Sequence, residues 1–182
     1  SRSACSSLNA FYTASDSGRN ATTDCFGTTT SGKFVKTAKS GEETCAAGGY
    51  CPGSVKVYYN STGGRTECGA GKYNASTGSS SSSACANITA GCYGTSASSS
   101  CPAVCAANTY SNAGESACTA CDSDYANSGD TAESHAGVAS CKVTCAAGTY
   151  VASSGAACTD VGNGYYTTES QTISQGSTGS RS

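Results

Sequence analysis

The chain has 182 residues, a formal net charge of −2 and 14 cysteines. Leu, Ile, Val and Phe together make up under about a tenth of its positions, well below the ~20% under which disorder is expected, which excludes an ordinary hydrophobic core. The lack of any Lys or Arg cluster argues against a nucleic-acid partner, because phosphate binding needs clustered positive charge. No apolar stretch approaches the ~18 residues of a membrane span.

The cysteines are even in number and spread along the whole chain. Disulfides are the usual substitute for a core that is too small. A disulfide that closes a loop of roughly 10 to 20 residues contributes about 3 kcal/mol of stability in the chain-entropy model. Disulfides persist in oxidising surroundings, so we expect an extracellular or cell-surface protein. No signal peptide opens the chain, and we interpret it as a mature or excised piece of a secreted precursor.

Taken in order, residues 1–50 are predicted to be degenerate cysteine-rich repeats, made of loops with brief extended pieces. Residues 51–100 are predicted to be cysteine-rich repeats with Ser-rich loops. Within them the Val55-x-Val57 run has β propensity and Gly63 and Gly64 can turn the chain back, which predicts a hairpin. The serine runs at 79–83 and 98–100 are low-complexity tracts that could carry O-linked glycans.

The clearest repeat is in the second half, where residues 101–144 and 145–182 form two modules. Cys105-Ala-Ala-Asn-Thr-Tyr is repeated about 40 residues later as Cys145-Ala-Ala-Gly-Thr-Tyr, and a fixed period of that size indicates an array. Val161 and Arg181 stand where the first copy has Cys121 and Cys141. Two cysteines missing together favour a bond between them in the first copy, since a lone survivor would be a reactive thiol.

The tail at 166–182 contains no cysteine, and taken alone it is predicted to be disordered. However, residues 177–182 followed by residues 1–5 of another copy read much like residues 76–85. The chain is therefore either a window of a longer array or a subunit that docks head to tail, and such contacts build filaments unless the rotation closes. A frayed tail is the third interpretation.

Two sequential disulfide registers are possible. One joins Cys118 to Cys121 and closes very short loops with poor geometry. We adopt the other, although sequence alone does not fix connectivity. Its pairs are Cys5–Cys25, Cys45–Cys51, Cys68–Cys85, Cys92–Cys101, Cys105–Cys118, Cys121–Cys141 and Cys145–Cys158. A miniature core is expected from tyrosines that pack on these disulfides or on one another, namely Tyr73, Tyr93, Tyr110, Tyr125, Tyr150 and Tyr165.

Four Asn residues, Asn20, Asn60, Asn74 and Asn87, begin Asn-x-Ser/Thr sequons without proline in the middle. In a secreted chain they predict N-linked glycans.

The sequence gives less support for a metal site or for catalysis. Cys118, Cys121, Cys141 and Cys145 have nearly the spacing of a four-thiolate zinc site, but the second copy loses only two of them. The acidic run from Asp122 to Glu133 resembles a calcium loop, but Ala126 and Asn127 occupy key positions, so it is interpreted as a solvated turn. His135, the only histidine, is interpreted as solvent-exposed and has no nucleophile or base at a suggestive spacing. We predict no metal, no cofactor and no enzyme.

The Cys-Ala-Ala-Gly-Thr-Tyr phrase, its closing Cys158-Thr and the later Gly-Tyr-Tyr together resemble the cysteine-rich repeats of ephrin-receptor-like and tumour-necrosis-factor-receptor-like ectodomains. They are similar above all to the long arrays in surface and extracellular proteins of protists and algae. The resemblance is clear over 101–166, patchy from Cys45 and faint before it. It implies small disulfide-rich repeats, mostly irregular with short β-hairpins, in an elongated ladder without a single hydrophobic core. It transfers no catalytic residue.

From these observations we expect a secreted, glycosylated structural protein of an extracellular filament or surface coat, self-associated head to tail. The alternative is a receptor-like or adhesive ectodomain that binds a protein ligand.

Overall fold

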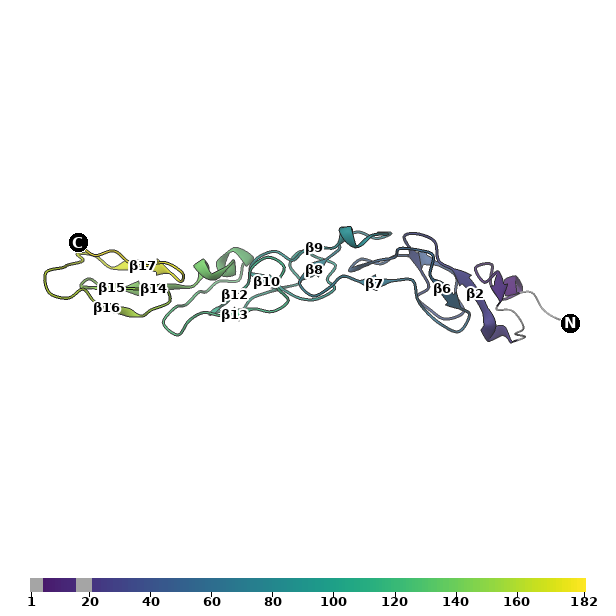
Figure 1. Ribbon diagram of the computed structural model, residues 1–182, viewed down its shortest axis with the longest axis horizontal. Helices are drawn as coiled ribbons and strands as arrows, with labels where there is room; N and C mark the ends of the chain where they lie inside the picture. Colours follow the sequence, from purple (N-terminus) through teal and green to yellow (C-terminus); the bar gives the residue numbers. More distant parts are fainter. Residues whose placement is uncertain (1–4, 16–20) are drawn as a thin grey trace. The chain divides into compact units, whose positions relative to one another are not determined.

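The computed structural model describes residues 5–15 and 21–182 (Figure 1). The strands are short: β1 Ala14–Ser15, β2 Cys25–Thr28, β3 Lys33–Phe34, β4 Glu43–Thr44, β5 Gly49–Tyr50, β6 Lys56–Tyr58, β7 Thr66–Glu67, β8 Lys72–Tyr73, β9 Ala86–Asn87, β10 Cys92–Tyr93, β11 Ala103–Val104, β12 Thr109–Tyr110, β13 Thr119–Ala120, β14 Lys142–Cys145, β15 Thr149–Val151, β16 Cys158–Asp160 and β17 Gln171–Ser174. Short 3-10 turns lie at η1 Cys5–Ser7, η2 Thr22–Asp24, η3 Ser82–Ala84, η4 Ala132–His135 and η5 Val138–Ser140. The described residues contain no α-helix.

Nearly all strands pair in twos, as β3–β4, β5–β7, β8–β9, β10–β11, β12–β13, β14–β17 and β15–β16. The exception is a three-stranded sheet in the order β1–β2–β6. The pairs with a recorded register are antiparallel. The mostly irregular, disulfide-rich fold expected from the composition is therefore confirmed.

The chain also contains a seven-residue structural repeat. We call each copy a heptapeptide and number its positions 1 to 7. The fourth position has a positive φ angle at Gly32, Gly48, Gly71, Gly91, Asn108, Gly148 and Gly164. Glycine adopts this conformation without strain, and asparagine tolerates it better than most residues. The heptapeptides are residues 29–35, 45–51, 68–74, 88–94, 105–111, 121–127, 145–151 and 161–167.

Consecutive heptapeptides, except 121–127 and 145–151, are joined by a pair of backbone hydrogen bonds, which we call a rung. The N–H of Gly148 donates to the carbonyl oxygen of Thr167, position 7 of the next heptapeptide, at 3.2 Å, and the carbonyl oxygen of Gly148 accepts from the N–H of Val161, position 1, at 3.1 Å. The same two bonds, at 2.7 to 3.1 Å, are made by Gly32, Gly48, Gly71, Gly91 and Asn108. The left-handed residue therefore carries the stacking.

Burial follows position in the heptapeptide. Position 1 is buried in all copies but the one that begins with Cys121, and the buried residues are Thr29, Cys45, Cys68, Ile88, Cys105, Cys145 and Val161. Position 7 is buried at Val35, Cys51, Asn74, Ser111, Asn127 and Val151. Half-cystines and small residues thus take the place of a hydrophobic core.

The expected tyrosine core is wrong for most of its members. Tyr93 is 37% exposed and Tyr165 51% exposed, while Tyr73, Tyr110 and Tyr150 are half-buried. Four of these tyrosines occupy position 6, within the short strands β8, β10, β12 and β15. Of the six, Tyr125 alone is buried.

The predicted hairpin after Val55 is also wrong in its partner. The strand itself forms as β6, but it pairs with β2, through Phe26 opposite Tyr58 and Gly27 opposite Val57. Gly63 exchanges two backbone hydrogen bonds with Val35 instead of closing a hairpin on β6. A long-range partner with a rigid disulfide of its own, Cys5–Cys25, therefore outcompetes the local turn.

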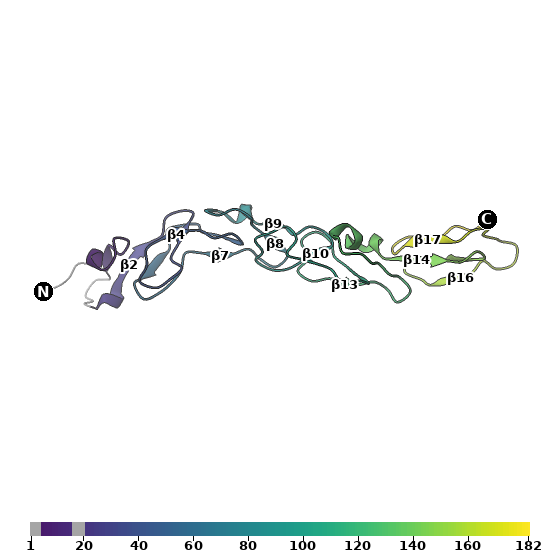
Figure 2. The ribbon, with the colours of Figure 1, turned by 180° about the vertical axis from the view of Figure 1, so that it is seen from behind.

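The tail is ordered, contrary to its composition. Gln171–Ser174 forms β17 and pairs with β14 over four residues, and the two strands lie side by side in both ribbon views (Figure 1, Figure 2). Further on, Gly179 N–H donates to the Val151 carbonyl at 2.9 Å. The tail thus obtains order from the strands it lies against rather than from buried apolar side chains.

By its contacts the chain divides into two units. The first comprises residues 1–69, 73–86 and 96–99, and the second comprises residues 70–72, 87–95 and 100–182. Rungs of the same geometry occur within each unit.

Candidate functional site

All fourteen cysteines are engaged in disulfides, in the sequential register given above. Most of them begin a heptapeptide or close the loop that follows it. Cys45–Cys51 differs, because it joins positions 1 and 7 of a single heptapeptide. Cys118, Cys121, Cys141 and Cys145 belong to three separate disulfides, which leaves no thiolate set for zinc.

The sequons differ sharply in their surroundings. Asn60 lies in the turn after β6 and is exposed, and Asn87 in β9 is exposed with its Oδ1 accepting a hydrogen bond from Lys72 Nζ at 2.9 Å. Exposure of the residue is what an N-linked glycan requires. Asn20 lies outside the described residues.

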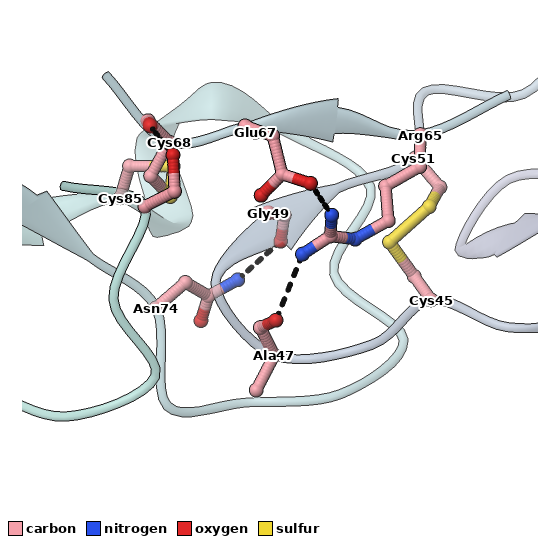
Figure 3. Close-up of polar contacts among 10 residues, drawn as sticks. Cys45, Ala47, Gly49, Cys51, Arg65, Glu67, Cys68, Asn74 and Cys85 are labelled. Atoms are coloured by element: carbon pink, nitrogen blue, oxygen red, sulfur yellow. Dashed lines mark hydrogen bonds and ion pairs between the residues drawn. A yellow bond between two sulfur atoms is a disulfide. The ribbon is translucent and has the colours of Figure 1, made fainter. Parts of the chain in front are cut away.

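Asn74 is built into the first unit instead. The residue is 3% exposed, and its Nδ2 donates to the Gly49 carbonyl at 2.8 Å (Figure 3). Its Oδ1 accepts from the Ser76 N–H at 3.0 Å. A glycan is attached through Nδ2, so the folded protein offers no room for one here. Asn74 is position 7 of its heptapeptide, and its carboxamide ties that heptapeptide to the preceding one.

Arg65 lies on the side of Gly49 opposite to Asn74 (Figure 3). Its Nη2 donates to the Ala47 carbonyl at 2.9 Å and its Nη1 pairs with Glu67 (Figure 3). A Cβ added at Gly49 would lie 3.0 Å from the guanidinium carbon and 2.5 Å from the Thr66 carbonyl oxygen. The guanidinium group thus lies against the backbone at position 49, where only glycine leaves enough space for it.

His135 is not the exposed histidine that its polar surroundings indicate. It is fully buried, with Nδ1 2.9 Å from the Thr109 carbonyl oxygen and Nε2 2.9 Å from the Gly129 carbonyl oxygen. The same Thr109 carbonyl accepts from Asn127 Nδ2 at 2.9 Å. His135 therefore anchors the 128–140 loop to strand β12, a role in which it contacts no nucleophile.

The acidic run beside it forms no ion-binding cluster. Within residues 5–15 and 21–182, no group of three or more His, Cys, Asp or Glu side chains is placed to hold a metal. Asp122 and Asp124 lie beside Tyr125, whose hydroxyl donates to the Ala156 carbonyl at 3.0 Å. Burial of the ring, reinforced by the two carboxylates, raises the pKa of Tyr125.

Position-equivalent residues close the two matched modules in different ways. Cys121 and Cys141 form a disulfide. Forty residues on, Arg181 Nη1 donates to the Val161 carbonyl at 3.0 Å, and the guanidinium lies 4.8 Å from the Tyr150 ring centre and 4.2 Å from that of Tyr165. We call this contact the arginine clasp. The sequence signal for it was the arginine in a cysteine position, which the repeat alignment exposes but does not explain.

Comparisons with protein-family models, curated proteins and solved structures found no match to this chain. In the part of the chain that the structure describes, no helix has the length and apolar character needed to cross a membrane.

Proposed function

We propose that this chain is a secreted structural protein that assembles head to tail in an extracellular filament or surface coat. The supporting observation is the combination of stacked heptapeptides with disulfides at all fourteen cysteines. The rungs are made by backbone groups alone, so such a stack can be extended without new side-chain chemistry. The disulfides suit a protein outside the cell, where thiols are oxidised.

The surface supports the same role. It is dominated by Ser, Thr and Gly, and the exposed sequons at Asn60 and Asn87 suit N-linked glycans. The repeats resemble those of ephrin-receptor-like and tumour-necrosis-factor-receptor-like ectodomains, which are themselves extracellular. The role proposed is mechanical rather than catalytic.

The test is electron microscopy of the protein secreted from eukaryotic cells and concentrated at neutral pH. Uniform fibres support the proposal, whereas single particles at every concentration contradict it. Intact mass before and after enzymatic removal of N-linked sugars tests the glycans separately, and an unchanged mass contradicts them.

A receptor-like or adhesive ectodomain is the second candidate. It is favoured by the exposed tyrosines Tyr58, Tyr93, Tyr165 and Tyr166, because tyrosine is enriched in protein interfaces. Under this alternative the chain stays monomeric and a partner protein is captured from the surface of neighbouring cells. Capture that is lost when Tyr93 and Tyr166 are changed to Ser would favour it.

A further inference from the structure

The heptapeptide at 161–167 takes part in the rung from Gly148, but its own fourth position, Gly164, forms no rung. Val161 is buried at position 1, and Gly164 at position 4 has φ +86°, close to the +85° of Gly148. Among the described residues, neither the N–H nor the carbonyl of Gly164 has a hydrogen-bond partner. The two most exposed large hydrophobic residues of the described part of the chain, Tyr165 at 51% and Tyr166 at 62%, are next to it.

What fits this face is fixed by the rungs elsewhere. The partner must offer an N–H at its position 1 and a carbonyl at its position 7, with an apolar or half-cystine side chain at position 1. The heptapeptide at 29–35 does not qualify, because its position-1 N–H, that of Thr29, already donates to the Val55 carbonyl at 2.9 Å.

Residues 8–14 offer the position-1 N–H of Leu8 and the position-7 carbonyl of Ala14, which also lies opposite Phe26 in the β1–β2 pair. They share a variant geometry with residues 121–127: Tyr12 N–H donates to the Asn9 carbonyl at 3.0 Å, as Tyr125 N–H donates to the Asp122 carbonyl at 2.9 Å. In both segments the tyrosine at position 5 is buried, at 0% and 3% exposed. The variant form stacks well, since residues 121–127 form the rung with Asn108.

Position 1 of this segment also matches a stacking partner. Leu8 follows Cys5 by three residues, as Ile88 follows Cys85, and Ile88 N–H donates to the Gly71 carbonyl. In the single chain, Leu8 N–H donates only to the Cys5 carbonyl within a 3-10 turn, at 3.0 Å. That local bond can be exchanged for a bond to a second molecule.

We infer that residues 8–14 of one copy stack on Gly164 of a second copy. Leu8 N–H donates to the Gly164 carbonyl. Gly164 N–H becomes a second donor to the Ala14 carbonyl, which is paired in β1, just as Gly91 and Gly137 both donate to the position-7 carbonyl of Ser111. This inference rests on the proposed head-to-tail assembly and names the surfaces that make it.

The experiment compares Gly164→Val with Gly162→Val in the full oxidised chain. Both glycines have positive φ, at +86° and +79°, and a Cβ at either would meet no atom within 4 Å, so the two variants carry matched strain. Only Gly164 holds the rung position. Sedimentation velocity over a concentration series should show association of the wild type and of Gly162→Val, and association of Gly164→Val weakened by about tenfold or more for two lost hydrogen bonds.

Hydrogen exchange of the same samples identifies the contact. The Gly164 and Leu8 amides should become protected as concentration rises, while the Gly162 amide should not. Association with Gly164 unprotected, or equal weakening by both variants, overturns this inference and leaves the assembly proposal standing. A wild-type chain that stays monomeric at all concentrations overturns both.

Discussion

The modules at 105–144 and 145–182 reach the same backbone arrangement by different chemistry. In the first, Ala126 and Lys142 exchange two backbone hydrogen bonds at 2.9 and 2.8 Å. Forty residues later, Tyr166 and Ser182 exchange the same pair at 2.9 and 3.2 Å. The first arrangement is closed by the Cys121–Cys141 disulfide and the second by the arginine clasp.

The difference shows which features the fold requires. The backbone bonds survive the loss of a disulfide, so the heptapeptide geometry specifies the structure and the covalent bond adds stability to it. The two closures differ in strength, because a disulfide across 20 residues contributes about 3 kcal/mol in the chain-entropy model. An exposed cation–π contact contributes about 0.5–1 kcal/mol.

The largest effect should come from removing the covalent closure. Changing Cys121 and Cys141 together to Ala is expected to lower the free energy of opening of the 121–144 segment by about 3 kcal/mol, the loop-closure contribution of the bond. Hydrogen exchange of the amides in both modules measures this, with residues 145–182 as the internal reference. An equal loss in both modules would show that they do not open independently.

The converse change should give the second module a disulfide. In Val161→Cys/Arg181→Cys, the two thiols occupy the positions of Cys121 and Cys141, so an eighth bond should form on oxidative secretion. The expected gain in opening free energy is about 2 kcal/mol, the disulfide contribution less that of the lost clasp. Mass spectrometry of the non-reduced peptide joining the two positions checks the bond. Free thiols at both positions would mean that the modules are not superimposable there.

Much of this fold could be read from the sequence, and the reason lies in the repeat. The paired absence of Cys121 and Cys141 in the second copy indicated their bond, because two aligned copies act as a substitution experiment. The small proportion of Leu and Ile indicated a fold without an ordinary core. Both inferences depend on composition and spacing, which a single sequence displays fully.

What the sequence concealed depends on contacts between distant residues. The buried His135 lies between the Thr109 and Gly129 carbonyls, and no local sequence pattern predicts this contact. The β6 strand was visible in the Val55-x-Val57 run, but its partner β2 was not. The left-handed fourth position of the heptapeptide was also not recognisable, because Asn108 occupies it in one copy and glycine is common throughout this chain.

A smaller effect should come from the clasp itself. Arg181→Met keeps much of the aliphatic length but removes the charge and the hydrogen bond to Val161, and it is expected to lower the opening free energy of the second module by about 1 kcal/mol. Lys142→Met is the control, since Lys142 is exposed and only its backbone takes part in the corresponding exchange. Hydrogen exchange of the Gly148 and Val161 amides measures this opening free energy. An unchanged opening free energy would mean that the backbone bonds alone hold the second module.

The smallest effect distinguishes the modules by pH. Tyr125 and Tyr165 are equivalent residues, but Tyr125 is 3% exposed and Tyr165 51%. Burial, with Asp122 and Asp124 nearby, raises the pKa of Tyr125, and so favours the neutral phenol in the folded state. This contribution to stability is present below about pH 10, the usual tyrosine pKa, and is lost as pH rises through the raised value. Tyr125→Phe should therefore make the first module less sensitive to alkaline pH in hydrogen exchange, with the second module of the same variant as the internal reference. An unchanged pH profile of the first module would show that the Tyr125 ring is not buried in solution.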